Sequence, residues 1–301
     1  MKVFVAGATG AIGQPLIAAL IAQGHTVTGM THSEAGARRL RAAGVDVAIA
    51  DALNGDAVEG VLRASHAEVV IDELTAIPRT PSELSAHAHV DQKLRIEGGN
   101  NLHRAALACG VRRYIQQSSG FFLDAKEGLA DESSPLALNA SPGIAKYAQM
   151  YAYVEQRVLQ SSIEGVALRY GFFYGPNTWY NPDGGAADEI RKQLFPVIEG
   201  GKAKWSFVHI EDAARATVAT LTAEPGKYVV VDDDTSPVSV WLPRFASFVG
   251  APPPPLITED EVLQTAGEDA VYYQTQLCGA SNVKAKRELH FAPRQREWLN
   301  E

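Results

Sequence analysis

The sequence predicts an α/β fold: a Rossmann-like, doubly wound parallel sheet with a smaller C-terminal substrate lobe. Short apolar runs alternate with amphipathic helical segments through the first half of the 301 residues, a pattern typical of a parallel sheet with helices on both faces. A glycine-rich turn, residues 7–13, lies between the first apolar run and the first helical segment. The second half alternates less regularly, which favours a separate lobe.

Each element of the first half has its own signal. Ile12, Leu16 and Leu20 recur at helical spacing, and Gly24 supplies a stop. Glycines at positions 44 and 110 end two later helical segments in the same way. We expect strands over residues 3–6, 25–30, 45–50, 68–74 and 111–117, a sixth strand from residue 166, and helices over residues 12–23, 34–43, 54–64, 82–109 and 143–160.

The second half carries fewer elements. Residues 205–210 and 228–231 are predicted strands, residues 211–221 a helix, residues 181–185 a loop, and residues 252–255 a stiff proline linker. We therefore assign the chain to a dinucleotide-binding core and a substrate-binding lobe. The core covers residues 1–174, with residues 205–232 returning to it, and the lobe covers residues 175–204 and 233–301.

Composition excludes several classes of function. Lys and Arg total 27 against 35 Asp and Glu, a net charge of −8, whereas nucleic-acid binders carry basic patches. No apolar run approaches the ~20 residues of a membrane span, and the first residues resemble a core strand rather than a signal peptide. We expect a cytoplasmic protein without nucleic-acid or membrane partners. No metal is expected, because His87 and His89 would not converge on a helix and Cys109 and Cys278 have no ligand spacing.

The glycine turn predicts a dinucleotide site. Gly7 permits a tight turn, Gly10 lets the backbone approach a pyrophosphate, and Gly13 lets the helix pack close to the sheet. The N–H groups at the helix start then hold the phosphates. The alternative is a plain strand-to-helix turn. The residues expected to contact the cofactor here are Gly7, Thr9, Gly10, Ala11, Ile12 and Gly13.

The end of the second predicted strand favours NADP. An acidic residue there would bind the ribose 2′-hydroxyl of NAD. This strand instead ends in Thr31, His32 and Ser33, with Arg38 nearby, and these side chains suit a 2′-phosphate. NAD is left open, since Ser33 also suits the N-cap of the next helix.

Several short motifs, taken in order, resemble the short-chain dehydrogenase/reductase superfamily, in its extended branch similar to NAD-dependent epimerases and dehydratases. They span residues 1 to about 235, and the C-terminal part is similar only in general character. Beside the glycine turn, the motifs are Asp51-Ala52-Leu53, Ser118-Ser119, Tyr147, Leu168-Arg169-Tyr170-Gly171-Phe172-Phe173-Tyr174-Gly175-Pro176 and Phe207-Val208-His209-Ile210-Glu211-Asp212.

The resemblance implies the catalytic residues. Ser119 would orient the substrate oxygen, and Tyr147 would exchange a proton with a hydroxyl or carbonyl group while the nicotinamide moves hydride. The family has a lysine four residues after the tyrosine, whose charge lowers the tyrosine pKa. This chain has Tyr151 there, which would hydrogen-bond the ribose instead. Packing in the core or at a dimer face is the alternative for Tyr151.

Further side chains are expected beside the cofactor, because ligands of open α/β sheets bind at the carboxyl ends of the strands. A side chain of Asp51 or Ala52 would reach the adenine, and Phe172 would stack on the nicotinamide or form an apolar substrate wall. The other expected cofactor contacts are Leu74, Thr75 and Ser118.

The predicted fourth strand departs from the family pattern. The family commonly ends this strand with a small apolar loop, and this chain has Asp72 and Glu73. Because two acids on an apolar strand need partners or solvent, we interpret them as a solvated strand end.

The leading function is an NADP-preferring oxidoreductase or epimerase-type enzyme acting on a hydroxyl or carbonyl carbon of a small molecule. One alternative is a non-catalytic NADP sensor, suggested by the missing lysine. A further alternative is a nucleotide-sugar epimerase or dehydratase, with Arg191, Lys192, Lys202 and Lys204 for a diphosphate. The resemblance also implies a homodimer formed by the helices predicted over residues 82–109 and 143–160.

Overall fold

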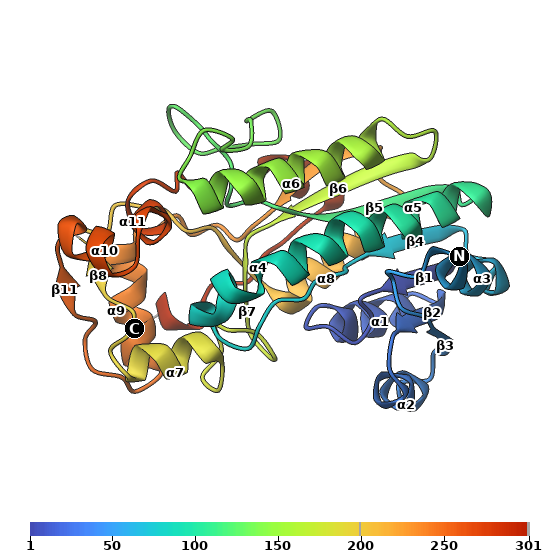
Figure 1. Ribbon diagram of the computed structural model, residues 1–301, viewed down its shortest axis with the longest axis horizontal. Coiled ribbons are helices and arrows are strands. Elements are labelled where there is room, and N and C mark those ends of the chain that lie inside the picture. Colours follow the sequence, from blue (N-terminus) through green and yellow to red (C-terminus); the bar gives the residue numbers. More distant parts are fainter. Residues whose placement is uncertain (199, 300–301) are drawn as a thin grey trace.

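A seven-stranded parallel sheet forms the centre of the computed structural model, which describes residues 1–198 and 200–299. The predicted doubly wound α/β fold is confirmed (Figure 1). The strand order is β10-β6-β5-β4-β1-β2-β3. These strands are β1 (Lys2–Ala6), β2 (Thr26–Thr31), β3 (Asp46–Ile49), β4 (Val69–Asp72), β5 (Arg113–Ser119), β6 (Glu164–Tyr170) and β10 (Gly226–Val230).

Helices cover both faces of the sheet, so its strands are buried on both sides, as is usual for a parallel sheet. In β1, Val3 and Val5 face the core under α1 (Gly13–Ala22) and α8 (Ile210–Ala219). The alternate residue Phe4 faces the opposite core. The helices of that opposite face are α3 (Gly55–Ser65), α5 (Gly99–Ala108) and α6 (Pro142–Leu159), and α2 (Glu34–Ala42) packs against β2 and β3.

The helix predicted over residues 82–109 is present but changes pitch along its length. It begins with a 3-10 turn (Pro81–Glu83) and continues as α4 (Leu84–Lys93). A π-helical segment (Leu94–Gly98) then leads into α5. Single π turns inside α-helices are frequent at functional sites, because they redirect the side chains that follow.

The second half adds a smaller lobe beside the carboxyl ends of the strands. Residues 252–255 lie outside helices and strands, as predicted, whereas the predicted strand over residues 205–210 pairs with β7 outside the main sheet. The lobe elements that the sequence pattern missed range from two-residue strands to an 11-residue helix. Outside the main sheet lie β7 (Phe172–Tyr174), α7 (Gly185–Arg191), β8 (Val197–Ile198), β9 (Phe207–His209), α9 (Val238–Phe248), β11 (Leu256–Ile257), α10 (Glu259–Thr265), α11 (Glu268–Thr275), α12 (Val283–Leu289) and a 3-10 turn (Glu297–Leu299).

One hydrophobic core joins α6 to the lobe, through Tyr151, Phe207 and Trp241 among others. The predicted domain boundaries stay a prediction, and residues 199, 300 and 301 of the predicted lobe lie outside the described residues.

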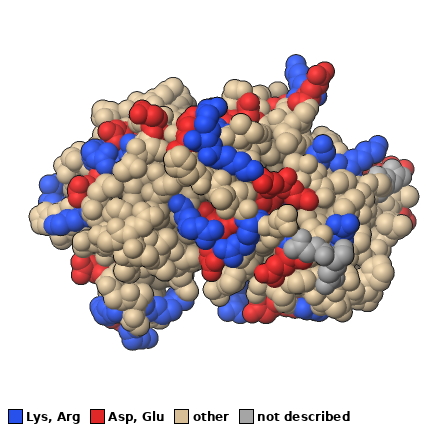
Figure 2. Space-filling view, turned by 180° about the vertical axis from the view of Figure 1, so that it is seen from behind, with Lys and Arg blue, Asp and Glu red and all other residues tan. Residues whose placement is uncertain are grey.

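The molecular surface carries mixed charge. Figure 2 shows Lys and Arg side chains interspersed with Asp and Glu over one face. Within the described residues, no helix is both long and apolar enough to cross a membrane.

Candidate active site

The glycine turn between β1 and α1 has the geometry of an anion-binding turn. Gly7 has a φ of +78°, and a Cβ there would lie 2.3 Å from the carbonyl oxygen of Glu73. A Cβ on Gly13 would lie 2.4 Å from the Ala8 carbonyl oxygen. Both positions therefore need glycine. No side chain caps the start of α1 at Ile12, so its first N–H groups are available to an anion, and the turn fits a dinucleotide pyrophosphate.

Of the side chains at the end of β2 and in the segment that follows, some are engaged in hydrogen bonds and others are exposed. Ser33 accepts a hydrogen bond from the Gly36 N–H at 3.1 Å and so caps α2, and buried Thr31 accepts one from the Ser33 N–H at 3.4 Å. His32 and Arg38 are exposed. Basic side chains gather at the end of the molecule where α2 lies (Figure 2). His32 and Arg38 are therefore the groups free to meet a phosphate.

The ends of β3 and β4 present few free polar groups. Asp51 is exposed and accepts a hydrogen bond from the Leu53 N–H at 2.9 Å. The carbonyl of buried Ala52 accepts from the Asn101 amide at 2.9 Å. After β4, Leu74 is buried and Thr75 half-buried. The sheet order places these two strand ends on either side of β1 and β2.

Asp72 and Glu73 are buried, so the interpretation as a solvated strand end is wrong. Asp72 accepts a hydrogen bond from the Tyr114 hydroxyl at 2.7 Å, and the Arg157 guanidinium lies 3.6 Å away. Glu73 is hydrogen-bonded to the Tyr170 hydroxyl at 3.1 Å. The partners come from β5, β6 and α6, which sequence spacing does not reveal.

Burial, supported by the nearby Asp72 carboxylate and opposed by the hydrogen bond to Tyr170, raises the pKa of Glu73 to about 8. The hydrogen bonds of the Tyr170 and Thr217 hydroxyls also agree with a protonated Glu73 carboxyl group. Thr217 donates to the Ala213 carbonyl at 2.8 Å, and the Tyr170 and Thr217 hydroxyls lie 2.5 Å apart. Tyr170 then donates its hydroxyl proton to Thr217. The hydrogen bond between Tyr170 and Glu73 therefore needs a proton on the Glu73 carboxyl group.

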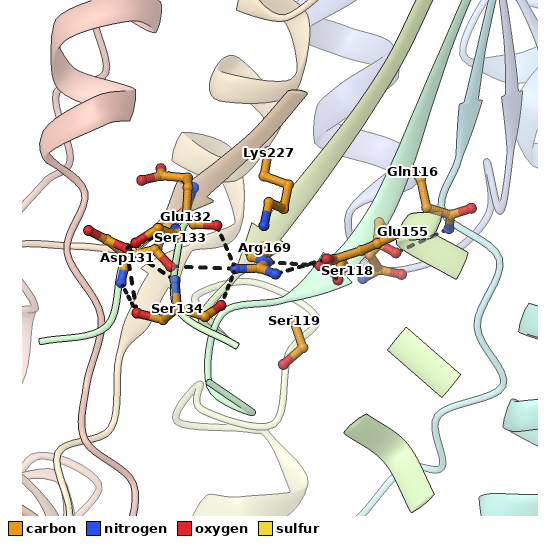
Figure 3. A network of polar contacts seen from close by, with 12 residues as sticks. Gln116, Ser118, Ser119, Asp131, Glu132, Ser133, Ser134, Glu155, Arg169 and Lys227 are labelled. Carbon is orange, nitrogen blue, oxygen red and sulfur yellow. Dashed lines mark hydrogen bonds and ion pairs between the residues drawn. The ribbon is translucent and has the colours of Figure 1, made fainter. Parts of the chain in front are cut away.

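The adjacent serines at the end of β5 have different partners. Ser118 donates a hydrogen bond to Glu155 at 2.6 Å, and Glu155 forms an ion pair with Arg169 at 2.8 Å. Arg169 also bonds carbonyl groups of the segment containing Ser134 (Figure 3). Ser119 points away from this network and accepts from the Phe121 N–H at 3.3 Å. The Ser118 hydroxyl is thus engaged in a buried structural network.

Tyr147 and Tyr151 lie one turn apart on α6. The Tyr147 hydroxyl is buried without a hydrogen-bond partner among the described residues, and its ring stacks on Phe122 at 5.8 Å. Tyr151 is buried, with the Arg95 guanidinium carbon 5.4 Å from its ring centroid. Burial raises the pKa of both tyrosines, and the Arg95 charge opposes that rise.

An aromatic stack connects these groups to the lobe. The rings of Phe121 and Phe172 are stacked with centroids 4.0 Å apart, and Phe172 stacks on Trp205 at 4.5 Å. Because Phe121 bonds Ser119 and stacks on Phe172, and Phe122 stacks on Tyr147, the side chains of Ser119, Tyr147 and Phe172 are connected through these two rings near the carboxyl ends of β5 and β6. Arg38 and Asp51 belong to the other edge of the sheet, beside β2 and β3.

Sequence reasoning missed Arg95, which comes from the π-helical segment. Its spacing of four from Asp91 reads as an exposed helical ion pair. The structure instead buries both side chains, with Nε of Arg95 2.8 Å from Asp91. Burial of this pair depends on packing against β5 and α6, so the sequence carries no local signal for it.

Comparisons with known proteins agree with this architecture. The model of the NAD dependent epimerase/dehydratase family matches residues 3–231. A 3-diazoavenalumate denitrifying reductase of Streptomyces is 37% identical over 99% of this chain and 98% of its own length. A 4-hydroxy-2-methyl-3-oxo-4-farnesyl-3,4-dihydroquinoline-1-oxide ketoreductase of Stigmatella aurantiaca is 26% identical over 80% of this chain and 70% of its own.

Solved structures show the same fold at lower identity. The UDP-glucose 4-epimerase of Thermus thermophilus, in complex with NAD, is 23% identical with a TM-score of 0.75, covering 99% of this chain and 96% of that one. DesIV, a dTDP-glucose 4,6-dehydratase of Streptomyces venezuelae, is 17% identical with a TM-score of 0.76, covering 99% and 93%.

Proposed function

The chain belongs to the NAD dependent epimerase/dehydratase family of nicotinamide-dependent enzymes, and we propose that it is an NADP-preferring reductase of small planar substrates. The observation that carries this proposal is the hydroxyl of Tyr147, which is buried and has no hydrogen-bond partner in the part of the chain that the structure describes. Such a hydroxyl suits the donation of a proton to a substrate oxygen.

The protonation state of Tyr147 determines whether it can act as an acid or as a base toward the substrate. Oxidation of an alcohol needs tyrosinate as a base, whereas reduction of a carbonyl needs the neutral phenol as an acid. Burial raises the pKa of Tyr147, so the phenol keeps its proton at neutral pH. Tyr151 stands at the place where the family pattern has lysine, and among the described residues no ammonium group offsets that burial. We therefore assign reduction, with Ser119 orienting the substrate oxygen.

The cofactor supplies hydride when bound. Its pyrophosphate would lie on the turn formed by Gly7, Thr9, Gly10, Ala11, Ile12 and Gly13, and the 2′-phosphate would meet His32 and Arg38. Asp51 and Ala52 would border the adenine. The nicotinamide side would be formed by Leu74, Thr75, the backbone of Ser118, and Phe172.

The rings of Phe121, Phe172 and Trp205 stack on one another, and this cluster would give an aromatic substrate an apolar wall. In carbonyl reduction, hydride forms the new C–H bond while the proton of Tyr147 passes to the oxygen. The name of the Stigmatella relative includes a ketoreductase activity of this kind.

A second candidate reaction is the reductive loss of a diazo group. The specific support is the Streptomyces relative, 37% identical and named a denitrifying reductase of a diazo compound. For an aryl diazonium, hydride forms a C–H bond as the C–N bond breaks and N₂ leaves. That reaction needs no proton donor, which suits a poorly acidic Tyr147.

The nucleotide-sugar alternative has less support. Arg191, one of its expected diphosphate ligands, already donates to the carbonyls of Pro182 at 2.7 Å and Val249 at 3.1 Å. The sensor alternative predicts binding of NADPH without turnover of any substrate.

A turnover assay tests these functions together. Purified protein with NADPH is given aromatic ketones or an aryl diazonium salt, and protein with NAD is given a UDP-sugar, in separate reactions. We expect NADPH oxidation with one of the first two and no new sugar product from the UDP-sugar, which is measured as product because epimerisation consumes no net cofactor. Tight NADPH binding with no oxidation in any reaction would favour the sensor instead.

The predicted homodimer also belongs to the proposal. Val90, Leu107 and Tyr153 are 44%, 43% and 42% exposed, and they lie on α4, α5 and α6. The Tyr153 hydroxyl donates to Asn100 at 2.9 Å, so α5 and α6 form one continuous face. We expect sedimentation at micromolar concentration to give twice the 32.3 kDa chain mass.

A further inference from the structure

We propose that Tyr273 contacts the substrate and limits the size of the substrate that reaches Tyr147. Its ring forms the lobe side of the place where an aryl ketone or an aryl diazonium would lie. This inference deepens the proposed reductase function and rests on it. It concerns α11, a short lobe helix that no sequence pattern predicted.

Two sets of hydrogen bonds hold α11 in place. At its start, Asp269 Oδ1 accepts a hydrogen bond from the Gly143 N–H at 3.1 Å, so α11 lies against the start of α6 (Figure 1). Near its end, the Gln274 side chain accepts from the Ile198 N–H at 2.8 Å and donates to the Pro196 carbonyl at 2.6 Å. The position of α11 is therefore fixed by both α6 and β8.

Tyr147 and Tyr273 are connected through one buried ring. Tyr147 comes one turn after Gly143 on α6, and Tyr273 comes one turn after Asp269 on α11. The Phe122 ring centroid lies 5.8 Å from that of Tyr147 and 6.0 Å from that of Tyr273. Since Asp269 ties the two helices together, Tyr273 has a defined place on the lobe side of the proposed proton donor.

The Tyr273 ring stands at an angle to the stacked rings. Phe172 is nearly parallel to Phe121 and to Trp205, with interplanar angles of 17° and 21°. Tyr273 is inclined by 58° to Phe172 and by 53° to Trp205, with centroids 6.3 Å and 5.8 Å away. Trp205 Nε1 donates to the Tyr273 carbonyl at 2.5 Å and so fixes the backbone that carries the ring. The parallel rings and Tyr273 are therefore two aromatic sides that meet at an angle.

Part of these rings is open to a ligand. Tyr273, Phe121 and Phe172 are half-buried, whereas Tyr272, the neighbour of Tyr273 on α11, is 7% exposed. Partly open aromatic rings beside a few polar groups are typical of sites for small molecules. Because the Tyr147 hydroxyl is buried, a substrate that reaches it must displace a neighbouring side chain, and Tyr273 is a half-buried ring on that side.

This placement makes Tyr273 selective for size. A ketone that lies along Phe172 with its carbonyl group toward Tyr147 directs its far end to the α11 side. A small aryl group there gains an aromatic contact with Tyr273. A longer group meets the Tyr273 ring instead and is disfavoured by the clash.

Binding to the complex with NADP⁺ tests the inference without turnover, because NADP⁺ carries no hydride to transfer. The two probes are acetophenone and 4-acetylbiphenyl, which differ by one ring, and calorimetric titration measures the Kd of each. In Tyr273→Ala we expect the Kd of acetophenone to rise about 2- to 10-fold through the lost aromatic contact. The Kd of 4-acetylbiphenyl should fall. Tyr273→Phe keeps the ring and should keep both values.

Tyr272→Ala is the matched control, because it removes the same side chain from the adjacent buried position. It should leave the ratio of the two Kd values unchanged. If an alanine variant does not fold, Tyr273→Leu and Tyr272→Leu replace the pair, and the same contrast is expected. An unchanged ratio in the Tyr273 variant, an equal change in the Tyr272 variant, or no binding of either probe to the unchanged protein would overturn the proposal.

Failure of this inference differs from failure of the proposed function. Reduction of ketones with an unaltered ratio would keep the reductase and overturn the role of Tyr273. A reversed ratio without reduction of any ketone would support Tyr273 as the size-selective contact for an aromatic ligand and remove ketone reduction.

Discussion

Ser118 donates a hydrogen bond to Glu155 at 2.6 Å, while Ser119, the next residue of β5, faces away from that carboxylate (Figure 3). The two hydroxyls therefore predict opposite phenotypes. Ser118→Ala leaves a buried carboxylate with one bond fewer, so it should lower the free energy of unfolding by about 1–3 kcal/mol. Its kcat should change little. Urea unfolding with a turnover assay measures both.

Ser119→Ala is the matched variant. It should lower kcat/KM by about 10²-fold through poor orientation of the substrate and leave the urea midpoint nearly unchanged. If Ser118→Ala gave the larger loss of activity, the catalytic assignment would belong to Ser118 instead.

Tyr147→Phe distinguishes the two proposed reactions. It removes a hydroxyl group that has no hydrogen-bond partner among the described residues. The free energy of unfolding and the NADPH affinity should therefore stay close to those of the unchanged protein. Carbonyl reduction should lose about 10²–10⁴-fold in kcat, the usual contribution of a general acid. Reduction of an aryl diazonium should persist, because it needs hydride alone. Full ketone activity in this variant would remove Tyr147 from the mechanism.

Arg38→Ala tests the NADP preference. Losing the exposed guanidinium should raise the Kd for NADPH roughly tenfold, equivalent to about 1.4 kcal/mol, and leave the Kd for NADH unchanged. Arg39→Ala removes the same charge from the neighbouring exposed position of α2 and serves as the control. Calorimetric titration measures all four pairs. A preference for NADH in the unchanged protein would contradict the 2′-phosphate assignment.

We expect the substitution Glu73→Gln to raise the free energy of unfolding by an amount that depends on pH. The pKa of Glu73 is about 8 in the folded protein against 4.5 for the free side chain. Below pH 4.5 both states carry the proton, so the group has no effect there. As pH rises toward 8 the unfolded chain binds fewer protons than the folded one, and folding loses stability.

The variant should therefore be more stable than the unchanged protein by roughly 3–5 kcal/mol at pH 8, and by little at pH 4.5. Urea unfolding at a series of pH values checks the slope. A constant difference across that range would mean that Glu73 is charged in the folded protein.

Much of the fold follows from local features of the sequence. The strands and helices of the first half were predictable because each has its own apolar period and its own stop, as at Gly24 before β2. The turn at Gly7 was predictable because its positive φ and close backbone contact admit only glycine. The short lobe elements were not, since two-residue strands such as β8 carry no period.

The sequence by itself determined the parallel sheet, the dinucleotide turn and the identity of the serine and tyrosine candidates. Only the tertiary structure decided which of those groups are free to act. Ser118 is engaged by Glu155, and Glu73 is buried against Tyr170. Arg95 reaches Tyr151 from a segment more than fifty residues earlier in the chain. Charge, burial and hydrogen bonding depend on partners from distant parts of the chain, and local pattern does not specify those partners.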